Sequence, residues 1–280
     1  MDVPQPRRFA VLHHPKLPYS QELADQVAAF LQERGCSAWI GSSWDAAAIQ
    51  ERLDQLDMLI TLGGDGTILR TARIGAPARK PIIGINLGRV GFLVELQPDT
   101  WQDGLSTLLA DQFWLEERMM LRAEHWQGEH LLSSHLSLNE IVAARGRLAR
   151  VVRITAWVDG AQLYQYVADG LIAATPTGST AYAFAAGGPI MPPTLRNILL
   201  VPIAPMFGLA RPVVLSEGAQ VRLTVETDHE AILSVDGQFE VSLANGDEVG
   251  VQASEHTALF PRLRTKAYFY DSLSERLRCK

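Results

Sequence analysis

The feature that most constrains the fold is an alternation, from residue 7 to about residue 112, between short apolar runs and stretches of helical periodicity. The apolar runs are RFAVLHH, SAWIG, DMLITL and PIIGIN, and the helical stretches are SQELADQVAAFLQERG, WDAAAIQERLDQL and DGTILRTARIGA. Repeats of strand, helix and strand are typical of βαβ units around a parallel sheet. We therefore expect an α/β domain with a Rossmann-like parallel sheet over residues 1–114.

One of these helices is expected over residues 20–34. Ser20, followed by the acidic Glu22 and Asp25, is typical of a helix start, and Gly35 is typical of a C-terminal cap. The apolar positions of the stretch share one helical face, which we expect to be buried: Leu23, Val27, Phe30 and Leu31.

After a further expected helix over residues 99–113, the apolar period changes to two and β-branched residues become frequent. This predicts a β-rich second domain, a β-sandwich, over residues 115–257. Asp159-Gly160 stands between two alternating runs, as in a tight hairpin turn. The proline-rich stretches GGPIMPP and VPIAPMFGLARP are expected to be loops, because proline supplies no backbone donor to a ladder. Residues 258–280 are expected to return onto the first domain.

The composition excludes several classes of partner. The chain has 25 basic and 31 acidic residues and a formal charge of −6, so no global positive field favours nucleic acid or an anionic membrane. The densest basic stretch, RGRLARVVR from Arg145 to Arg153, is expected to be a solvated strand face. Cys36 and Cys279 make no disulfide framework, and neither an export signal nor a membrane-spanning run is recognised. We expect a cytoplasmic location.

The stretch LITLGGDGTILR, residues 59–70, has the residue types of a phosphate-binding turn. Gly63 and Gly64 lack Cβ atoms where a strand ends, and Gly66-Thr67 begin a helix whose N–H groups favour negative charge. It is not a Walker A motif, since no lysine follows the glycines, and it lacks the GxGxxG spacing. Asp65 in such a turn can hold Mg²⁺ on nucleotide phosphates or accept the proton of an attacking hydroxyl.

A structural alternative exists for this turn. GGDG can be a tight turn in which Asp65 caps the following helix through its backbone N–H groups. Similarly, Asn139-Glu140 can be an exposed polar pair at a strand end, and TPTGSTAY a loop with Ser and Thr as helix caps. In that last stretch a capped helix start would also present the N–H groups of residues 177–180 to a dinucleotide.

Five motifs together resemble the NAD kinase family. They are GGDGT at residues 63–67, GINLGRVGFL at 84–93, NE at 139–140, DGLIAATPTGSTAY at 169–182 and SVDGQ at 234–238. The resemblance implies an enzyme that transfers a phosphoryl group from ATP, with Mg²⁺, to the 2′-hydroxyl of the adenosine ribose of NAD, forming NADP. It also implies the family's two-domain fold, with NAD binding and oligomerisation in the second domain.

The resemblance assigns roles to individual residues. Asp65 is the catalytic residue, Asn139 contacts the adenine end and Glu140 the ribose hydroxyls. A carboxylate suits the last task, because it can accept hydrogen bonds from both hydroxyls of a diol. The adenosine pocket is lined by Thr180, Ala181 and Tyr182. Asp169 and Asp236 face the nicotinamide half, partly across a subunit interface. The other residues expected at the nucleotides are Gly63, Gly64, Gly66, Thr67, Phe92, Thr177, Ser179 and Gln238.

No structural metal is expected from the histidine and cysteine spacing, and Asp65 is the candidate Mg²⁺ ligand. Small molecules are the expected partners, in a homodimer or homotetramer. The chain departs from the family at Met206–Gly208, where a Pro-His-Ser-Leu stretch is common, so that the role of this loop is open. Val167 stands where polyphosphate-using members tend to have glycine, which favours ATP as donor.

Two other functions fit parts of the sequence. A kinase of lipid or sugar hydroxyls can share the GGDGT loop, although the motif at residues 169–182 argues against it. A non-catalytic dinucleotide sensor can keep the pocket without the chemistry, although the presence of Asp65, Asn139 and Glu140 argues against lost catalysis.

Overall fold

The computed structural model describes residues 5–88, 91–147 and 150–278, with side chains to residue 274. The chain divides into two compact units, Met1–Glu117 with Thr257–Lys280, and Arg118–His256. Cys36 is buried with a free thiol, and Cys279 lies outside the described residues. Within the described part of the chain, no helix combines the length and apolar character that crossing a bilayer requires.

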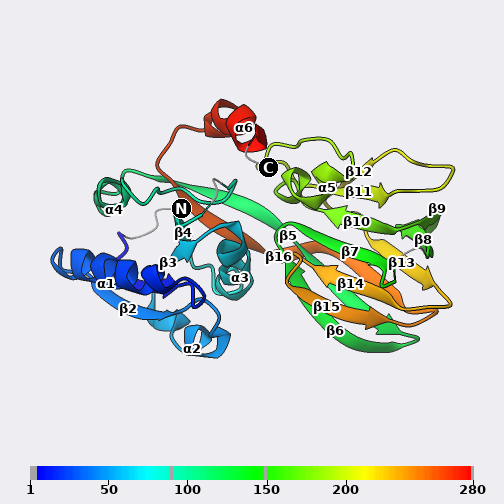
Figure 1. Cartoon of the computed structure of the whole chain (residues 1–280), viewed down its shortest axis with the longest axis horizontal. Helices are drawn as coiled ribbons and strands as arrows, with labels where there is room; N and C mark the ends of the chain where they lie inside the picture. The colour runs from blue at the N-terminus through cyan, green and yellow to red at the C-terminus, as the bar shows by residue number, and fades with distance from the viewer. Residues whose placement is uncertain (1–4, 89–90, 148–149, 279–280) are drawn as a thin grey trace. The chain divides into compact units, whose positions relative to one another are not determined.

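The first unit is built on a four-stranded parallel sheet in the order β2-β1-β3-β4, which confirms the predicted α/β class (Figure 1). The strands are β1 (Arg8–His13), β2 (Ser37–Ser42), β3 (Met58–Gly63) and β4 (Ile82–Asn86). The helices of this unit are α1 (Pro18–Gln32), α2 (Ala46–Gln50), the 3₁₀ turn η1 (Leu53–Gln55), α3 (Asp65–Gly75), α4 (Trp101–Leu109) and α6 (Tyr268–Arg278). β3 and β4 are buried along their whole length, as expected of strands in a parallel sheet.

Helix α1 shows how local sequence sets an element. It begins at Pro18, two residues before the predicted start, because proline is pre-organised for the first helical position. Ser20 instead closes the preceding turn, donating from its hydroxyl to the carbonyl of Leu17 at 2.7 Å. The predicted C-terminal cap is confirmed: Gly35 has φ of 75°, and the N–H of Cys36 bonds back to the carbonyl of Leu31 at 3.0 Å.

The second unit is a sandwich of two antiparallel six-stranded sheets, which confirms the predicted β-rich class. One sheet has the order β12-β11-β10-β7-β14-β15 and the other β6-β5-β16-β13-β8-β9. The core between the sheets contains Ile141 and Leu171 from the first and Ile154 and Leu223 from the second. Strands β5 to β9 are Trp114–Gln127, His130–Ser137, Glu140–Arg145, Val152–Val158 and Ala161–Ala168. Strands β10 to β16 are Gly170–Ala174, Asn197–Ile203, Val213–Ser216, Val221–Glu226, Ala231–Val235, Phe239–Leu243 and Glu248–Arg262.

The predicted hairpin at Asp159-Gly160 is confirmed, with φ of 51° and 83° between the paired strands β8 and β9. The prediction that residues 201–212 form a loop is wrong at its start, since β11 extends to Ile203 and Pro202 pairs with Leu171 of β10. Pairing of β11 with β12 ends at Leu200, so the missing N–H of Pro202 breaks no bond of that ladder.

Replacing Gly35 by alanine should destabilise the protein by about 1 kcal/mol, because a Cβ is unfavourable in the left-handed conformation. Gly218 is the matched control, since a Cβ at either glycine meets no atom within 4 Å and only Gly35 has positive φ. Urea denaturation of G35A and G218A measures both. Equal stability of the two variants would contradict the assignment of the cap.

Candidate active site

Asp65 is the first residue of α3, directly after the glycine pair at the end of β3. The N-cap residue is Gly64, which has no side chain to bond with. The Oδ2 of Asp65 accepts a hydrogen bond of 2.8 Å from the N–H of Phe92, and Oδ1 accepts one of 3.0 Å from the N–H of Leu93. The carboxylate thus accepts hydrogen bonds from two residues outside its own turn. The alternative, in which Asp65 caps the N–H groups of its own helix, does not predict these bonds.

Gly91 makes this contact possible. A Cβ built on Gly91 would lie within 3.0 Å of three atoms of the Asp65 carboxyl group, so only glycine lets the backbone come this close. Gly91 belongs to the GINLGRVGFL motif, of which residues 89 and 90 lie outside the described residues. The first unit therefore joins GGDGT to GINLGRVGFL through Asp65, a contact that the separate motifs did not predict.

The geometry leaves Asp65 able to receive a substrate hydroxyl. Each carboxylate oxygen has two acceptor positions, and the bonds to Phe92 and Leu93 occupy one on each oxygen. The residue is partly exposed, and a Cβ on Gly64 beside it would meet open space. A negative group at the start of α3 is also favoured by the helix dipole.

The other residues predicted in this turn have distinct surroundings. Gly63 faces the hydroxyl of the buried Thr67, which leaves no room for a Cβ, whereas Gly66 is exposed. Phe92 has a buried side chain, and its N–H is the group that meets Asp65. A purine contact of the Phe92 ring stays a prediction.

In the second unit, Asp236 organises the Asn139-Glu140 motif. Its carboxylate is buried and accepts bonds from the hydroxyl of Ser137 at 2.6 Å and from the N–H of Leu138 at 3.1 Å. It also accepts from the N–H groups of Asn139 at 2.8 Å and of Glu140 at 3.2 Å. This residue therefore fixes the backbone that carries Asn139 and Glu140. Its predicted contact with the nicotinamide half is not tested by this geometry.

The TPTGSTAY segment packs directly on the same backbone. The N–H of Thr175 donates to the carbonyl of Asn139 at 2.9 Å, and its hydroxyl donates to the carbonyl of Leu138 at 2.6 Å. A Cβ on Gly178 would collide with the Asn139 backbone, so glycine is required here as well. The structure thus brings the motif at residues 169–182 and the one at 139–140 together within one unit.

The expectation of a capped helix start with free N–H groups is wrong for Gly178 and Ser179, and the N-cap residue Thr177 makes no side-chain cap bond. The N–H of Gly178 donates to the Thr175 hydroxyl at 3.1 Å, and the N–H of Ser179 donates to the Thr175 carbonyl at 3.0 Å. The segment forms a tight 3₁₀ turn (Gly178–Thr180) before the four-residue helix α5 (Tyr182–Ala185), and Thr175 accepts the N–H groups of Gly178 and Ser179.

The hydroxyls of this segment are engaged as well. Ser179 Oγ donates to the Pro176 carbonyl at 2.7 Å and accepts from the Met191 N–H at 2.9 Å, and Thr180 Oγ1 donates to the Thr177 carbonyl at 3.2 Å. Thr177, Ser179 and Thr180 are buried, whereas Tyr182 is exposed and Ala181 partly so. The group best placed to touch a ligand here is the Tyr182 side chain.

Asp169 and Tyr182 line one cavity of about 270 Å³ in the second unit. Asp169 is held by Arg145, whose Nε and Nη2 reach Oδ1 at 2.7 Å and Oδ2 at 3.0 Å. The prediction of a solvated face is thus wrong for Arg145, whose side chain is mostly buried. Nothing in the alternating pattern reveals this, because Arg145 and Asp169 meet only through the pairing of β7 with β10.

The last predicted site residue, Gln238, and the two departures from the family pattern all lie in the second unit. Gln238 lies in the β14–β15 turn, where its N–H donates to the Val235 carbonyl at 3.0 Å. The two departures from the family pattern meet, because the N–H of Met206 donates to the carbonyl of Val167 at 2.9 Å. Met206 and Phe207 expose large apolar side chains.

Family comparison covers most of the chain. The ATP-NAD kinase N-terminal domain family matches residues 9–113, and the ATP-NAD kinase C-terminal domain family matches residues 138–263. The chain belongs to the ATP-NAD kinase family. The resemblance inferred from the five motifs is thus confirmed.

Individual relatives of this family align over nearly the whole chain. An NAD kinase of Chloroflexus aurantiacus is 40% identical over 271 residues, 97% of this chain and 98% of the relative. One of Dehalococcoides mccartyi is 38% identical over 273 residues, 97% and 96% of the two chains. These ATP-NAD kinase relatives confirm the predicted enzyme class, a phosphotransferase that acts on NAD.

Solved structures of the ATP-NAD kinase family share the fold. An NAD kinase from Archaeoglobus fulgidus in complex with ATP matches with a TM-score of 0.79 and 29% identity, covering 98% of this chain and 99% of that one. Yeast NADH kinase complexed with NADH matches with a TM-score of 0.82 and 24% identity, covering 97% and 87%, and supports the fold alone.

Replacing Gly91 by alanine should lower kcat by about a hundredfold, because the new methyl group displaces the Asp65 carboxyl and misplacement of a catalytic group by about 1 Å has this effect. G88A is the control in the same segment, since a Cβ on Gly88 meets no atom within 4 Å. NADP formation by both variants checks this. A kcat of G91A equal to that of G88A would contradict it.

Replacing Asp236 by asparagine should raise the KM for NAD at least tenfold. The amide keeps one acceptor oxygen, but in either orientation its nitrogen faces at least one backbone N–H of residues 138–140 and cannot accept from it. The lost bonds should also lower stability by about 1 to 3 kcal/mol. D228N, a change of the same charge at a fully solvated side chain, is the control. Initial-rate kinetics with unfolding curves measure both effects, and an unchanged KM would show that this backbone does not shape the NAD site.

Proposed function

We propose that this ATP-NAD kinase family member transfers the γ-phosphoryl group of ATP to the 2′-hydroxyl of the adenosine ribose of NAD, with Asp65 orienting and deprotonating that hydroxyl. The observation that carries this is the Asp65 carboxylate itself, held by the N–H groups of Phe92 and Leu93 with acceptor positions to spare. Such fixed orientation suits phosphoryl transfer, in which catalysis consists mostly of positioning and charge stabilisation.

Asp65 has a limited but definite task in this reaction. It accepts a hydrogen bond from the ribose hydroxyl and aligns the hydroxyl oxygen with the γ-phosphorus. It takes the proton as the new oxygen–phosphorus bond forms and the bond between the γ-phosphorus and the β,γ-bridging oxygen breaks, which releases ADP. The two backbone N–H bonds hold the carboxylate in place while this happens, so no reorganisation is needed during the reaction.

The second unit is proposed to bind NAD. Glu140 accepts from the ribose hydroxyls and Asn139 contacts adenine, supported by the fixed backbone that Asp236 provides. Tyr182 packs on the adenosine from the edge of the cavity that Asp169 also lines. Thr177, Ser179 and Thr180 shape this region, since their hydroxyls or side chains are buried within it.

Mg²⁺ is proposed to arrive with ATP. In the described part of the chain, no group of three or more His, Cys, Asp or Glu side chains is placed to hold a metal ion. A single carboxylate still fits Mg²⁺, because this ion commonly takes one or two carboxylates and completes its shell with phosphates and water. Asp65 is the residue that would hold it, beside the open space at Gly64. When bound, Mg²⁺ neutralises charge on the β- and γ-phosphates.

The setting of the enzyme is part of the proposal. We infer a cytoplasmic location from the scarcity of cysteine and a homodimer or homotetramer from the family resemblance. ATP rather than polyphosphate is the proposed donor, because Val167 replaces the glycine of polyphosphate users.

Incubation of the purified protein with ATP, Mg²⁺ and NAD should yield NADP, and D65N should lower kcat by about 10² to 10⁴-fold, the usual contribution of a general base. D54N, at an exposed carboxylate of the same unit, is the control. Calorimetry should show that D65N still binds NAD. NAD binding by the wild type without turnover from any donor would instead identify a sensor, and full activity of D65N would refute the role of Asp65.

A further inference from the structure

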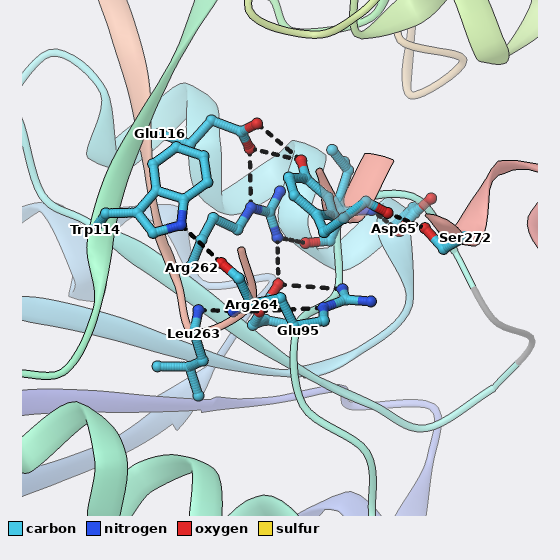
Figure 2. Close-up of polar contacts among 10 residues, drawn as sticks. Asp65, Glu95, Trp114, Glu116, Arg262, Leu263, Arg264 and Ser272 are labelled. Carbon is cyan, nitrogen blue, oxygen red and sulfur yellow. Dashed lines mark hydrogen bonds and ion pairs between the residues drawn. The ribbon is translucent and has the colours of Figure 1, made fainter. Parts of the chain in front are cut away.

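Arg262, at the end of β16, is buried with its whole side chain inside the first unit. Its guanidinium bonds two carboxylates that are also buried: Nε reaches Oε2 of Glu116 at 2.8 Å, and Nη1 reaches Oε2 of Glu95 at 2.9 Å. Figure 2 shows the guanidinium between these two acids. A buried charge is stable only when paired in this way, so the three side chains hold one another in fixed positions.

Further contacts complete the cluster. The hydroxyl of Tyr268, from α6, donates to the Glu116 carboxylate at 2.8 Å. Glu95 also accepts from the N–H of Leu263 at 3.1 Å and pairs with Arg264. Burial alone would raise the pKa of Glu95, but Arg262 and Arg264 hold it below its ordinary value. Burial likewise tends to lower the pKa of Arg262, which Tyr268, Glu116 and Glu95 raise on balance. Both groups are therefore charged at neutral pH.

The cluster is connected to Asp65 through one residue. Nη1 of Arg262 donates to the carbonyl of Leu93 at 3.1 Å, and the N–H of the same Leu93 donates to Asp65 Oδ1 at 3.0 Å. Leu93 is thus held at both of its backbone polar groups, by a fixed cation on one side and by the proposed catalytic carboxylate on the other. Figure 2 shows Asp65 and the Arg262 cluster in the same close-up.

We propose that Arg262 is a positioning residue for the phosphoryl transfer, fixing Leu93 so that its N–H, with that of Phe92, aims the Asp65 carboxylate at the acceptor hydroxyl. This inference rests on the proposed role of Asp65. It makes Arg262, with its partner Glu116, part of the support for catalysis, although Arg262 lies nearly 200 residues from Asp65 in the sequence.

Arg264 provides a matched comparison. It pairs with the same Glu95, with Nη2 at 3.3 Å from Oε2, but within the described part of the chain no hydrogen bond joins it to Leu93. Its side chain is partly exposed, whereas that of Arg262 is wholly buried. Removal of either arginine takes one cation from Glu95, and only removal of Arg262 releases the Leu93 carbonyl.

The main variant is R262M with E116Q, compared with E116Q alone. Methionine fills the space without a donor, glutamine avoids an uncompensated buried carboxylate, and Glu95 keeps Arg264, so this pair should fold where R262M alone fails. We expect kcat to fall about ten- to a hundredfold, since alignment of the base is lost. The KM for NAD should stay within twofold, because no group on NAD is touched. R262K, which keeps the charge and a donor, should recover part of kcat.

Hydrogen exchange supplies a second readout. In R262M/E116Q the amides of Phe92 and Leu93 should exchange at least tenfold faster than in E116Q, while the β3 amides keep their protection. R264Q should keep kcat within twofold of the wild type.

The outcomes separate the two proposals. A folded R262M/E116Q with the kcat of E116Q, or an R264Q as impaired as that double variant, would overturn the positioning role while D65N remains inactive. A fully active D65N would overturn the proposed function itself, and this inference with it.

Discussion

Two hydrogen bonds from consecutive backbone N–H groups to one carboxylate hold together the two motifs of the first unit. Phe92 and Leu93 donate them and Asp65 receives them, and the approach is possible only because Gly91 has no side chain. A side chain with rotamer freedom would otherwise sample several directions in a loop. Backbone donors are more rigid than side-chain donors, so they fix the orientation of the carboxylate. Each oxygen keeps a second acceptor position for another donor.

Carboxylates accept hydrogen bonds from consecutive backbone N–H groups at other positions in the chain as well. Asp236 accepts from the N–H groups of three consecutive residues of the second unit, and Glu95 accepts from those of Leu263 and Arg264. In each instance an acidic side chain orders backbone that lies mostly outside the sheet ladders, with Glu140 at the first residue of β7 as the exception. Carboxylates suit this task, since bonds to a charged acceptor are stronger than those between neutral groups. Asp236 and Glu95 thus order backbone, and Asp65 does so as well in addition to its proposed contact with the substrate.

The sequence predicted those features that depend on near neighbours. Gly35 and the Asp159-Gly160 turn were identified because a left-handed backbone conformation is determined by one or two residues. The fold class followed from periodicity, and the family from motifs. Two of the errors concern pairing between distant segments. Pro202 was assigned to a loop because its strand partners were unknown, and Arg145 to solvent because Asp169 is brought to it only by the sheet. Arg262 was not singled out, since an arginine in an alternating strand is usually exposed.

The hairpin turn at Asp236 has a consequence for the order of folding. Its carboxylate bonds to Asn139 across 97 positions of the chain, so the closure entropy of a long segment must be overcome before the bond forms. Contacts between such distant residues form late and slowly compared with local ones. The backbone of residues 138–140 therefore acquires its shape only once the strands on either side of that turn are in register, and a nascent chain that ends before Asp236 lacks the carboxylate that fixes it.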